Sequence, residues 1–329
     1  MIVAFNAGEA LGRCLRSLKG EPGLEVIVVD NGDRGLEIEE AERMVGVNVV
    51  SPGRNLGFAG GCNRGAEQAS GEVLVFLNPD TVAAPGAITA LAEAVEDEAV
   101  GCAMARLRLL DEPELLNSGG NIVHLSGLGW AGGYRQPAAG IVDVRDVPYP
   151  SGAAMAIRAD LFRELGGFTD ELFMYLEDLE LGWRARLRGL RVVVTPDADV
   201  YHDYEFGRNP GKRYLIERNR LVFVSSAYSP RLLLLVTPVL VAVDLGLLVL
   251  AAREGWLREK LGAWGWCLRN TAWLRRHRRE VQQLRRVPDR QLARFLTPTL
   301  DPQMIAVPRL ASPANRLMRG YWRVAQKLL

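Results

Sequence analysis

The strongest constraint on the fold is an alternation of short apolar runs with helix-patterned stretches over the first two hundred residues. Residues 25–30 are almost continuously apolar, as expected of a parallel strand that is buried on both faces. In residues 9–18, by contrast, Leu11, Leu15 and Leu18 share one helical face. This alternation predicts an α/β fold with an open, mostly parallel sheet flanked by helices, and ligands beyond the carboxyl ends of its strands.

The same pattern predicts the individual elements. Strands are expected at residues 1–5, 25–30, 47–50, 72–77 and 191–194, and helices at residues 9–18, 59–69, 85–96 and 177–188. Residues 152–164 are patterned as a strand followed by a helix. The glycine-rich stretch 101–150 has low periodicity, so we expect it to add mixed strands and loops.

Charge and cysteine content exclude several classes of protein. The chain carries 40 basic and 39 acidic residues, so bulk charge does not favour nucleic-acid binding. The four cysteines stand far apart without a CxxC pair, which argues against a zinc site or a redox dithiol. The first residues lack the basic region and cleavage site of a signal peptide. The α/β part is therefore expected to face the cytoplasm.

The character of the chain changes after residue 231. Residues 232–252 are apolar apart from one threonine, Pro238, Asp244 and one glycine, close to the roughly twenty residues that span a membrane. Insertion scales give Asp244 a cost of about 2.5–3.5 kcal/mol at the centre of a span, and Pro238 is expected to kink a helix. A re-entrant or interface-lying helical pair therefore explains this segment as well as a true span does.

A basic segment follows the apolar one. Residues 253–286 contain ten Lys or Arg against three Glu, and four of the seven tryptophans. These are features of an amphipathic helix on an anionic membrane face, although a packing helix with an arginine-rich solvent side has them too. Because the two segments are adjacent, we favour the membrane interpretation.

In residues 313–329, one helical face carries apolar side chains and is expected to dock on this chain or on a neighbour: Leu317, Tyr321, Val324 and Leu328.

Polar residues follow the predicted strands. Asp30 ends the second strand, where a carboxylate can bind a nucleotide's ribose or base, or simply begin a turn. Residues 54–63 carry Gly57, Gly60 and Gly61 before a helix, a pattern that admits phosphate or packs the helix closely on the sheet. This stretch is neither GxGxxG nor a P-loop, which disfavours a nicotinamide-binding oxidoreductase.

Acidic residues mark two further candidate positions. Asp80, in Asn78-Pro79-Asp80, follows the fourth strand and can hold Mg²⁺ or Mn²⁺, although a Pro-Asp turn is the common alternative. Glu177 and Asp178 open a helix, where acids favour the helix dipole but can also supply a general base. His202 becomes a candidate metal ligand if it faces Asp80.

In order along about residues 1–220, these motifs resemble glycosyltransferase family 2, the inverting GT-A enzymes, and most closely its rhamnosyltransferase-like branch acting on lipid-linked glycans. The segments that carry the resemblance are Phe5-Asn6, Val28-Val29-Asp30-Asn31, residues 55–63, Asn78-Pro79-Asp80 and the stretch from Gly166-Gly167-Phe168 to Glu177-Asp178. Two departures stand out. Asn78 replaces the first acid of the family's DxD motif, and the first strand begins at Met1 with fewer preceding residues than is usual.

The resemblance implies a role for each matching residue. Asp178 would be the general base in the acidic pair with Glu177, and Asp80 with His202 would bind Mn²⁺ or Mg²⁺. The nucleotide would be bound by Phe5, Asn6, Asp30, Arg54, Asn55, Gly60, Asn63 and Asn78. The pocket for the sugar and the acceptor would be lined by Ser151, Gly152, Ala153, Tyr175 and Trp183.

The resemblance also implies an activity. A sugar, with rhamnose from dTDP-rhamnose as the first choice, would pass with inversion from a nucleotide-diphosphate sugar to a polyprenyl-diphosphate-linked saccharide. The reaction would take place at the cytoplasmic face of the membrane, in cell-surface polysaccharide biosynthesis. Residues 1–220 would form the GT-A domain, and residues 221–329 a helical, membrane-associated region. A membrane-attached scaffold that has lost turnover is the alternative, and Asn78 gives it weight.

Overall fold

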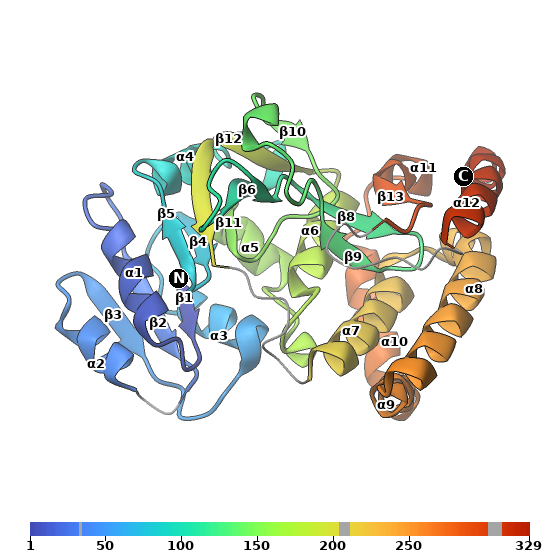
Figure 1. Ribbon diagram of the computed structural model, residues 1–329, viewed down its shortest axis with the longest axis horizontal. Helices are drawn as coiled ribbons and strands as arrows, with labels where there is room; N and C mark the ends of the chain where they lie inside the picture. Colours follow the sequence, from blue (N-terminus) through green and yellow to red (C-terminus); the bar gives the residue numbers. More distant parts are fainter. Residues whose placement is uncertain (33–34, 204–210, 302–310) are drawn as a thin grey trace.

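The structure is a computed structural model that describes residues 1–32, 35–203, 211–301 and 311–329. For residues 311 and 312 it describes the backbone alone. A large sheet flanked by helices occupies residues 2–202, and the C-terminal helices stand at one end of it (Figure 1).

The strands of the described residues are β1 (Ile2–Ala4), β2 (Val26–Asp30), β3 (Val47–Val50), β4 (Val73–Leu77), β5 (Thr81–Ala83), β6 (Val100–Leu109), β7 (Leu116–Ser118), β8 (Asn121–His124), β9 (Gly129–Ala131), β10 (Arg145–Asp146), β11 (Ala154–Arg158), β12 (Arg191–His202) and β13 (Leu296–Thr297). The α-helices are α1 (Glu9–Ser17), α2 (Leu36–Arg43), α3 (Gly57–Ala66), α4 (Ala87–Glu93), α5 (Ala159–Leu165), α6 (Glu177–Leu187), α7 (Lys212–Ala227), α8 (Pro230–Glu254), α9 (Leu257–Arg269), α10 (Thr271–Gln283), α11 (Asp289–Leu292) and α12 (Ala311–Ala325).

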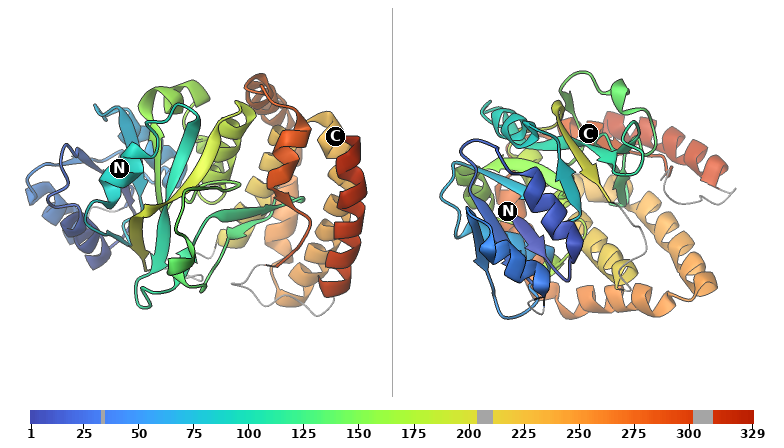
Figure 2. Two further views of the ribbon diagram at one scale, coloured as in Figure 1. Left: turned by 90° about the horizontal axis from the view of Figure 1, so that it is seen from above. Right: turned by 60° about the vertical axis from the view of Figure 1, so that its left-hand side comes forward.

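The large sheet has the strand order β10-β12-β6-β11-β4-β1-β2-β3, with β5 paired to β12 and β7 to β6. Strands β4, β1, β2 and β3 run parallel, whereas β11 runs antiparallel between β4 and β6. Helices lie on both sides of this sheet (Figures 1 and 2). The predicted α/β class is confirmed, and the mixed strands come from the glycine-rich stretch and the segments that follow it.

The predicted elements are present with shifted ends, and two shifts have clear causes. Helix α4 begins at Ala87 rather than at residue 85, because Gly86 takes a left-handed conformation with φ 80°. Strand β12 extends from Arg191 to His202, eight residues beyond the predicted end. Pairing with β6, and near its end with β5, holds this extension in place.

An aromatic cluster packs against β4 beneath the edge where the strands end. Phe76 of β4 meets Phe162 of α5 and Phe168, with ring centroids 4.9–5.5 Å apart in tilted and edge-to-face pairs. Such geometry suits the ring quadrupoles and adds to the gain from burial. The cluster fixes the start of the segment that runs from Phe168 to α6.

The C-terminal helices share a second core with the first part of the chain. Trp183 of α6 packs against Phe223 and Tyr228 from α7 and its end, with centroids 5.5–6.1 Å apart. Val123 of β8 and Leu232 of α8 join the same core. The predicted domain boundary after residue 220 therefore falls inside α7, and the helical region packs directly onto the sheet domain.

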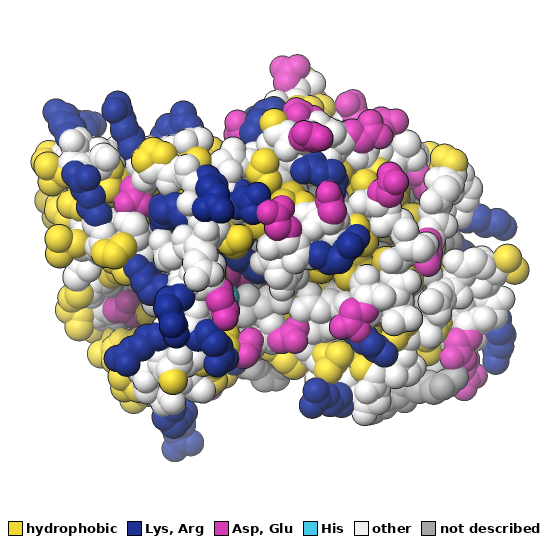
Figure 3. Space-filling view, turned by 180° about the vertical axis from the view of Figure 1, so that it is seen from behind, with side chains coloured by type: hydrophobic (Ala, Val, Ile, Leu, Met, Phe, Trp, Pro, Cys, Tyr) yellow, Lys and Arg dark blue, Asp and Glu magenta, His cyan; other side chains and the backbone are white. Residues whose placement is uncertain are grey.

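The apolar segment forms one continuous helix, α8, rather than a helical pair. Among the described residues α8 is the one helix long and apolar enough to cross a membrane, and only 17% of its most apolar window is buried. Large apolar side chains are exposed on α8, on α12 and on the 3₁₀ turn Gln326–Leu328 that follows it, and we call them the outer apolar face: Leu234, Val241, Leu245, Val249, Leu317, Tyr321, Val324 and Leu328. Figure 3 shows hydrophobic and basic side chains side by side at this end of the molecule, on the left of that view.

Candidate active site

Many of the predicted site residues lie at one edge of the sheet because the parallel strands end there. Phe5 and Asn6 follow β1, and both are exposed. Residues 78–80 follow β4, and His202 ends β12. Because β11 is antiparallel, its preceding residues 151–153 lie at the same edge. Segments far apart in the chain therefore converge as the strand pattern predicts.

Asp30 is buried at this edge with a defined orientation. Its Oδ1 accepts a hydrogen bond from the Gly32 N–H (3.0 Å), and its Oδ2 accepts one from the Ser51 hydroxyl (3.3 Å). The neighbouring Asn31 donates to the Gly57 carbonyl (2.7 Å) and so ties the strand end to the glycine-containing loop. This arrangement is compatible with a base-contacting carboxylate held by its own turn.

The glycines of residues 54–63 serve close packing. A Cβ on Gly57 would collide with the carbonyl oxygen of Phe173, and one on Gly61 would lie 2.8 Å from a methyl group of Val3. A Cβ on Gly60 would lie 3.0 Å from the Leu56 side chain. The predicted role of Gly60 in nucleotide binding is therefore wrong as a direct contact, because Gly60 lies buried inside α3.

The start of α3 is also occupied by the protein itself. The Gly57 N–H donates to the Asn55 side chain (2.8 Å), and the Ala59 N–H donates to the Phe173 carbonyl (3.1 Å). These N–H groups are no longer available to a phosphate. Arg54, by contrast, is exposed, and its nucleotide-binding role stays a prediction.

Asn63 binds the segment that begins at Phe168. Its Nδ2 donates to the Phe168 carbonyl (2.8 Å) and to Asp170 (2.6 Å), and its Oδ1 accepts from the Phe168 N–H (2.8 Å). Both ends of the amide thus hold residues 168–170. The prediction that Asn63 binds the nucleotide is wrong, because its hydrogen-bonding capacity is used by this segment.

Asp178 is linked to the candidate metal position through two hydrogen bonds, one to its side chain and one between backbone groups. The Gly152 N–H donates to Asp178 Oδ2 (3.0 Å), and the next residue, Ala153, accepts from the Asn78 N–H (2.9 Å) through its carbonyl. Asp80 lies two residues beyond Asn78. The carboxylate of Asp178 therefore lies beside the segment that carries Asp80, on the same edge of the sheet.

The acidic pair is electrostatically asymmetric. Burial raises the pKa of Asp178 to about 6, although the N–H groups of Gly152 and Leu179 act in the opposite direction. Burial, followed by the charge of Asp178, raises the pKa of Glu177 well above its ordinary value. The charge of Asp178 thus opposes the ionisation of Glu177, so that one carboxylate of the pair is favoured as the base, as a single general base needs.

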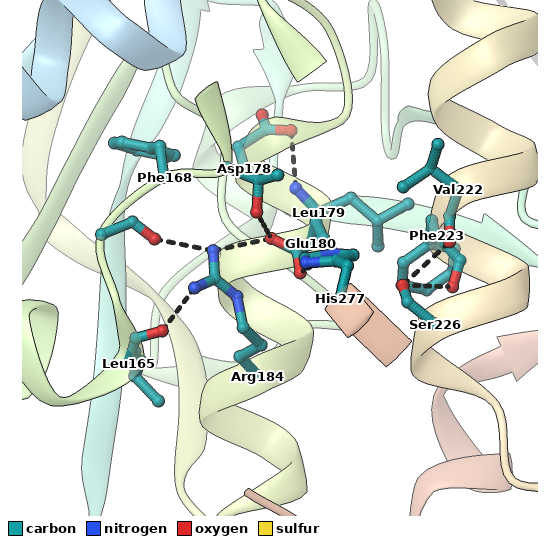
Figure 4. A network of polar contacts seen from close by, with 12 residues as sticks. Leu165, Phe168, Asp178, Leu179, Glu180, Arg184, Val222, Phe223, Ser226 and His277 are labelled. Atoms are coloured by element: carbon teal, nitrogen blue, oxygen red, sulfur yellow. Dashed lines mark hydrogen bonds and ion pairs between the residues drawn. The ribbon is translucent and has the colours of Figure 1, made fainter. Parts of the chain in front are cut away.

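A third acid, Glu180, anchors α6 beneath Asp178. Figure 4 shows its side chain between Arg184 and His277. Arg184 lies 2.6 Å from Glu180 Oε2 and also donates to the carbonyls of Leu165 and Gly167. Burial alone would raise the pKa of Glu180, but Arg184 and His277 outweigh it and hold this pKa at about 2. Glu180 is therefore a structural anion that fixes the start of α6.

Asp80 and His202 face each other, as a shared metal site requires. The Nε2 atom of His202 lies 3.3 Å from Oδ1 of Asp80. The Nδ1 atom of the same ring lies 3.0 Å from the side-chain oxygen of Asn117, which can only accept, so Nδ1 carries the proton. The Nε2 atom of His202 and the Asp80 carboxylate thus face each other, and imidazole and carboxylate groups can both be ligands of a cation placed beside them.

A second observation fits a divalent ion. Asp80 Oδ1 is buried and accepts no hydrogen bond from any described residue. The described residues contain no cluster of three or more His, Cys, Asp or Glu side chains, so Asp80 and His202 would hold an ion together with ligands from the substrate or water. Oxygen and imidazole donors suit Mn²⁺ or Mg²⁺. The residues present therefore fit a divalent cation that takes its other ligands from outside the described residues.

The predicted sugar and acceptor pocket divides in the structure. Residues Ser151, Gly152 and Ala153 lie beside Asp178, and Tyr175 lies in the loop that precedes it. Trp183, however, is 1% exposed and packs in the second core against α7. Its assignment to the pocket is wrong, because its ring is buried between α6 and α7 rather than exposed to a ligand.

Sequence reasoning missed two asparagines that organise this edge. Asn117 orients His202 and lies in the stretch Asn117-Ser118-Gly119-Gly120-Asn121, where the glycines were the available signal. Asn219 is fully buried in α7 and donates to the loop before Asp178. In a sequence, a polar residue between two arginines on a helix indicates a solvent-exposed face. Only the contacts in the structure show that Asn219 is buried.

The fold and the site are those of a glycosyltransferase, and comparison with known families agrees. The family model described as glycosyl transferase family 2 matches residues 1–166, slightly more than half of the chain. The chain belongs to this family.

Among individual proteins, it is similar to N-acetylglucosaminyl-diphospho-decaprenol L-rhamnosyltransferase of Mycobacterium tuberculosis. The two are 27% identical over 324 residues, which cover 88% of this chain and 95% of the relative. It is also 30% identical over 209 residues to the pre-mycofactocin glycosyltransferase of the same organism, covering 62% of this chain and 42% of that relative.

Solved structures share the fold. GalNAc-T7 with UDP, GalNAc and Mn²⁺ superposes with a TM-score of 0.58 at 19% identity, covering 68% of this chain and 47% of that one. The mannosyltransferase PcManGT of Pyrobaculum calidifontis, with GDP-Man and Mn²⁺, gives a TM-score of 0.51 at 15% identity, covering 99% and 84%. At these identities the likeness establishes the GT-A fold, as predicted.

Proposed function

We propose that this protein is an inverting, metal-dependent glycosyltransferase that transfers a sugar, with rhamnose from dTDP-rhamnose as the first candidate, to a lipid-linked saccharide. The observation that carries the proposal is the placement of Asp178 beside residues 152–153 and 78–80. An ionisable base and a candidate cation site thus share one edge of the sheet. The name of the mycobacterial relative supports both the sugar and the lipid-linked acceptor.

In this proposal the acceptor hydroxyl oxygen attacks the anomeric carbon of the donor from the side opposite the diphosphate. Asp178 takes the hydroxyl proton as the new carbon–oxygen bond forms. The bond from the anomeric carbon to the diphosphate breaks, and the nucleoside diphosphate leaves with its electron pair. The N–H groups of Gly152 and Leu179 hold the carboxylate of Asp178 in position for this transfer.

The remaining residues bind and orient the donor. Asp30, Asn6 and Phe5 would contact the nucleoside at the ends of β1 and β2, and Asn78 would lie close to the ribose. A divalent ion, Mn²⁺ or Mg²⁺, held by Asp80 and His202 would supply positive charge that offsets the charge of the departing diphosphate. Asn117 keeps His202 in the tautomer that such an ion needs.

The C-terminal helices would contact the lipid part of the acceptor. We propose that these helices lie in the interface of the membrane, on its cytoplasmic side. The outer apolar face of α8 and α12 is exposed, and α9 adds exposed Leu261 and Leu268 beside basic residues. A helix with this composition favours an anionic bilayer surface. A true span by α8 is disfavoured because Asp244, near its centre, pairs with Arg220 of α7, which would then lie deep in the bilayer.

The donor can be identified by thermal stabilisation with a panel of nucleotide sugars, with and without Mn²⁺. A ligand at one hundred times its Kd stabilises a protein by about 2.7 kcal/mol. We expect dTDP-rhamnose with Mn²⁺ to give the largest shift, and Asp80→Ala to remove the Mn²⁺-dependent part. Asp203→Ala, which removes a partly exposed partner of Arg13, is the control. Mn²⁺-dependent binding that survives Asp80→Ala would contradict the metal assignment.

The pH dependence of transfer should report the ionisation of Asp178. Because burial raises this pKa to about 6, the base is protonated and inactive at lower pH. We expect kcat/KM to rise about tenfold per pH unit below this value and to level off above it, since kcat/KM follows the free enzyme. The measurement is the initial rate of transfer at saturating Mn²⁺, over a pH range that extends below and above the Asp178 pKa. A profile that stays flat well below the Asp178 pKa would argue against this base.

The membrane proposal can be tested by substitution, because deleting the C-terminal helices would open the second core. The variant Leu245→Glu/Leu317→Glu changes two exposed side chains of the outer apolar face. Burying one leucine contributes about 1.5–3 kcal/mol, so we expect at least a tenfold loss of sedimentation with phosphatidylglycerol-containing vesicles. Leu36→Glu, which is as exposed as Leu317 but lies on α2, should bind like wild type. Equal binding by all three proteins would refute the membrane face.

A further inference from the structure

The loop between the 3₁₀ turn Asp170–Leu172 and α6 has an unusual backbone. Phe173, Tyr175 and Leu176 have φ values of 62°, 71° and 64°, in the left-handed region that favours glycine. Leu176 is the residue before Glu177 and Asp178, so the loop determines where α6 begins. A conformation of this kind persists only when surrounding contacts impose it.

Asn219 of α7 supplies contacts of that kind. Its side chain is fully buried, and its Nδ2 lies within hydrogen-bond distance of three loop carbonyls: Leu172 (2.8 Å), Met174 (2.9 Å) and Tyr175 (2.6 Å). One amide group therefore binds the backbone of the loop at three of its residues. Its acceptor end is used as well, because Arg218 Nε donates to Asn219 Oδ1 (2.9 Å).

Arg218 extends the same contact by one residue. Its Nη2 donates to the carbonyls of Glu171 (2.7 Å) and Leu172 (2.8 Å). On the opposite side of the loop, the Phe173 carbonyl accepts from the Ala59 N–H of α3. The loop is thus held between α3 and one turn of α7.

That turn of α7 is itself anchored to the C-terminal helices. Glu217 and Arg220, which flank Arg218 and Asn219, pair with Lys260 of α9 and Asp244 of α8. Neighbouring residues of one helical turn therefore bind the loop on one side and the membrane-facing helices on the other. Neither the family assignment nor the mechanism above uses Asn219.

We propose that Asn219 is the positioning residue for the general base, holding the Leu172–Leu176 loop so that Asp178 faces the acceptor hydroxyl. This inference rests on the proposed function. Asn219 touches no substrate and acts through the backbone of the loop. Loss of its amide donors would let the start of α6 move, and a displacement of about 1 Å at a reacting group can cost about 10² in rate.

The test uses the full-length chain and the isosteric variant Asn219→Asp, in which an oxygen atom replaces the NH₂ group that donates to the loop. Ser226→Ala is the matched control, since Ser226 is also fully buried in α7 but its hydroxyl donates to carbonyls of its own helix. Rates are expressed per nucleotide-binding site, counted by calorimetric titration, so that unfolded protein does not contribute. We expect kcat to fall about 30- to 100-fold in Asn219→Asp with donor KM nearly unchanged, and the control to keep wild-type kcat.

Hydrogen exchange gives a readout that does not depend on turnover. Amides of residues 172–177 should exchange faster in Asn219→Asp, while those of residues 222–227 keep wild-type protection. If Asn219→Asp does not fold, Arg218→Lys keeps the charge but loses the Nε donor, and it should show a smaller change in the same direction. Unchanged kcat per binding site in either folded variant overturns the proposal. If wild type transfers no sugar, the proposed function fails, and unchanged loop exchange then overturns the positioning role separately.

Discussion

Replacing Asp178 by asparagine is expected to lower kcat by about 10²–10⁴, because the acceptor hydroxyl loses the group that takes its proton. Donor binding should stay nearly intact, since asparagine keeps the size of the side chain and its acceptor oxygen for the Gly152 N–H. The measurement is initial-rate kinetics with a polyprenyl-diphosphate saccharide acceptor, together with calorimetric titration of the donor.

Glu177→Gln separates the two members of the acidic pair. Burial and the charge of Asp178 raise the pKa of Glu177 well above its ordinary value and so disfavour its charged form. Its neutral isostere should therefore keep far more turnover than Asp178→Asn. Full turnover in Asp178→Asn, or loss confined to Glu177→Gln, would show that the base is assigned to the wrong residue.

Replacing Lys260 by methionine is expected to destabilise the protein by about 3–5 kcal/mol, the usual cost of removing one partner from a buried ion pair. Lys260 is fully buried, contacts Glu217 and lies 2.6 Å from Asp244 Oδ1. Arg220, also fully buried, completes the group at 3.0 and 2.9 Å from the same two acids. Two cations and two anions thus compensate one another, and removing one leaves an uncompensated buried charge. Urea unfolding in the absence of lipid measures the effect.

Lys327→Met is the matched control, because Lys327 is exposed on the same C-terminal region and should change stability by less than about 0.5 kcal/mol. The double variant Lys260→Met/Glu217→Gln removes one charge of each sign and should be less destabilised than Lys260→Met alone. A Lys260→Met protein as stable as its control would mean that the four charges do not form a compensated group.

The same group explains why an acid lies near the centre of an otherwise apolar helix. From the sequence, Asp244 counts against membrane insertion, and its partners Arg220 and Lys260 lie 24 and 16 residues away. In the structure they neutralise it between α7, α8 and α9. Asp244 therefore marks the inner face of α8 and leaves the opposite, apolar face exposed.

Much of the fold was predictable because strand and helix periodicity is a local property of the chain. The strands that end at Asp30 and Leu77, and the acids placed just beyond or at their ends, followed from that pattern. Assignments that depended on which way a side chain points were less secure. Gly60 and Asn63 lie on the right loop but serve its packing, and Trp183 lies on the right helix but on its buried face.

By itself, the sequence determined the order of strands and helices, the edge at which the polar residues gather and the apolar and basic character of the C-terminal region, because each depends on neighbours along the chain. Only the tertiary structure decided that His202 faces Asp80, that Asp178 is tied to Gly152 and that Asn219 holds the loop before α6. These contacts join residues 26 to 122 positions apart. Their geometry is set by how the helices pack on the sheet, which no local pattern encodes.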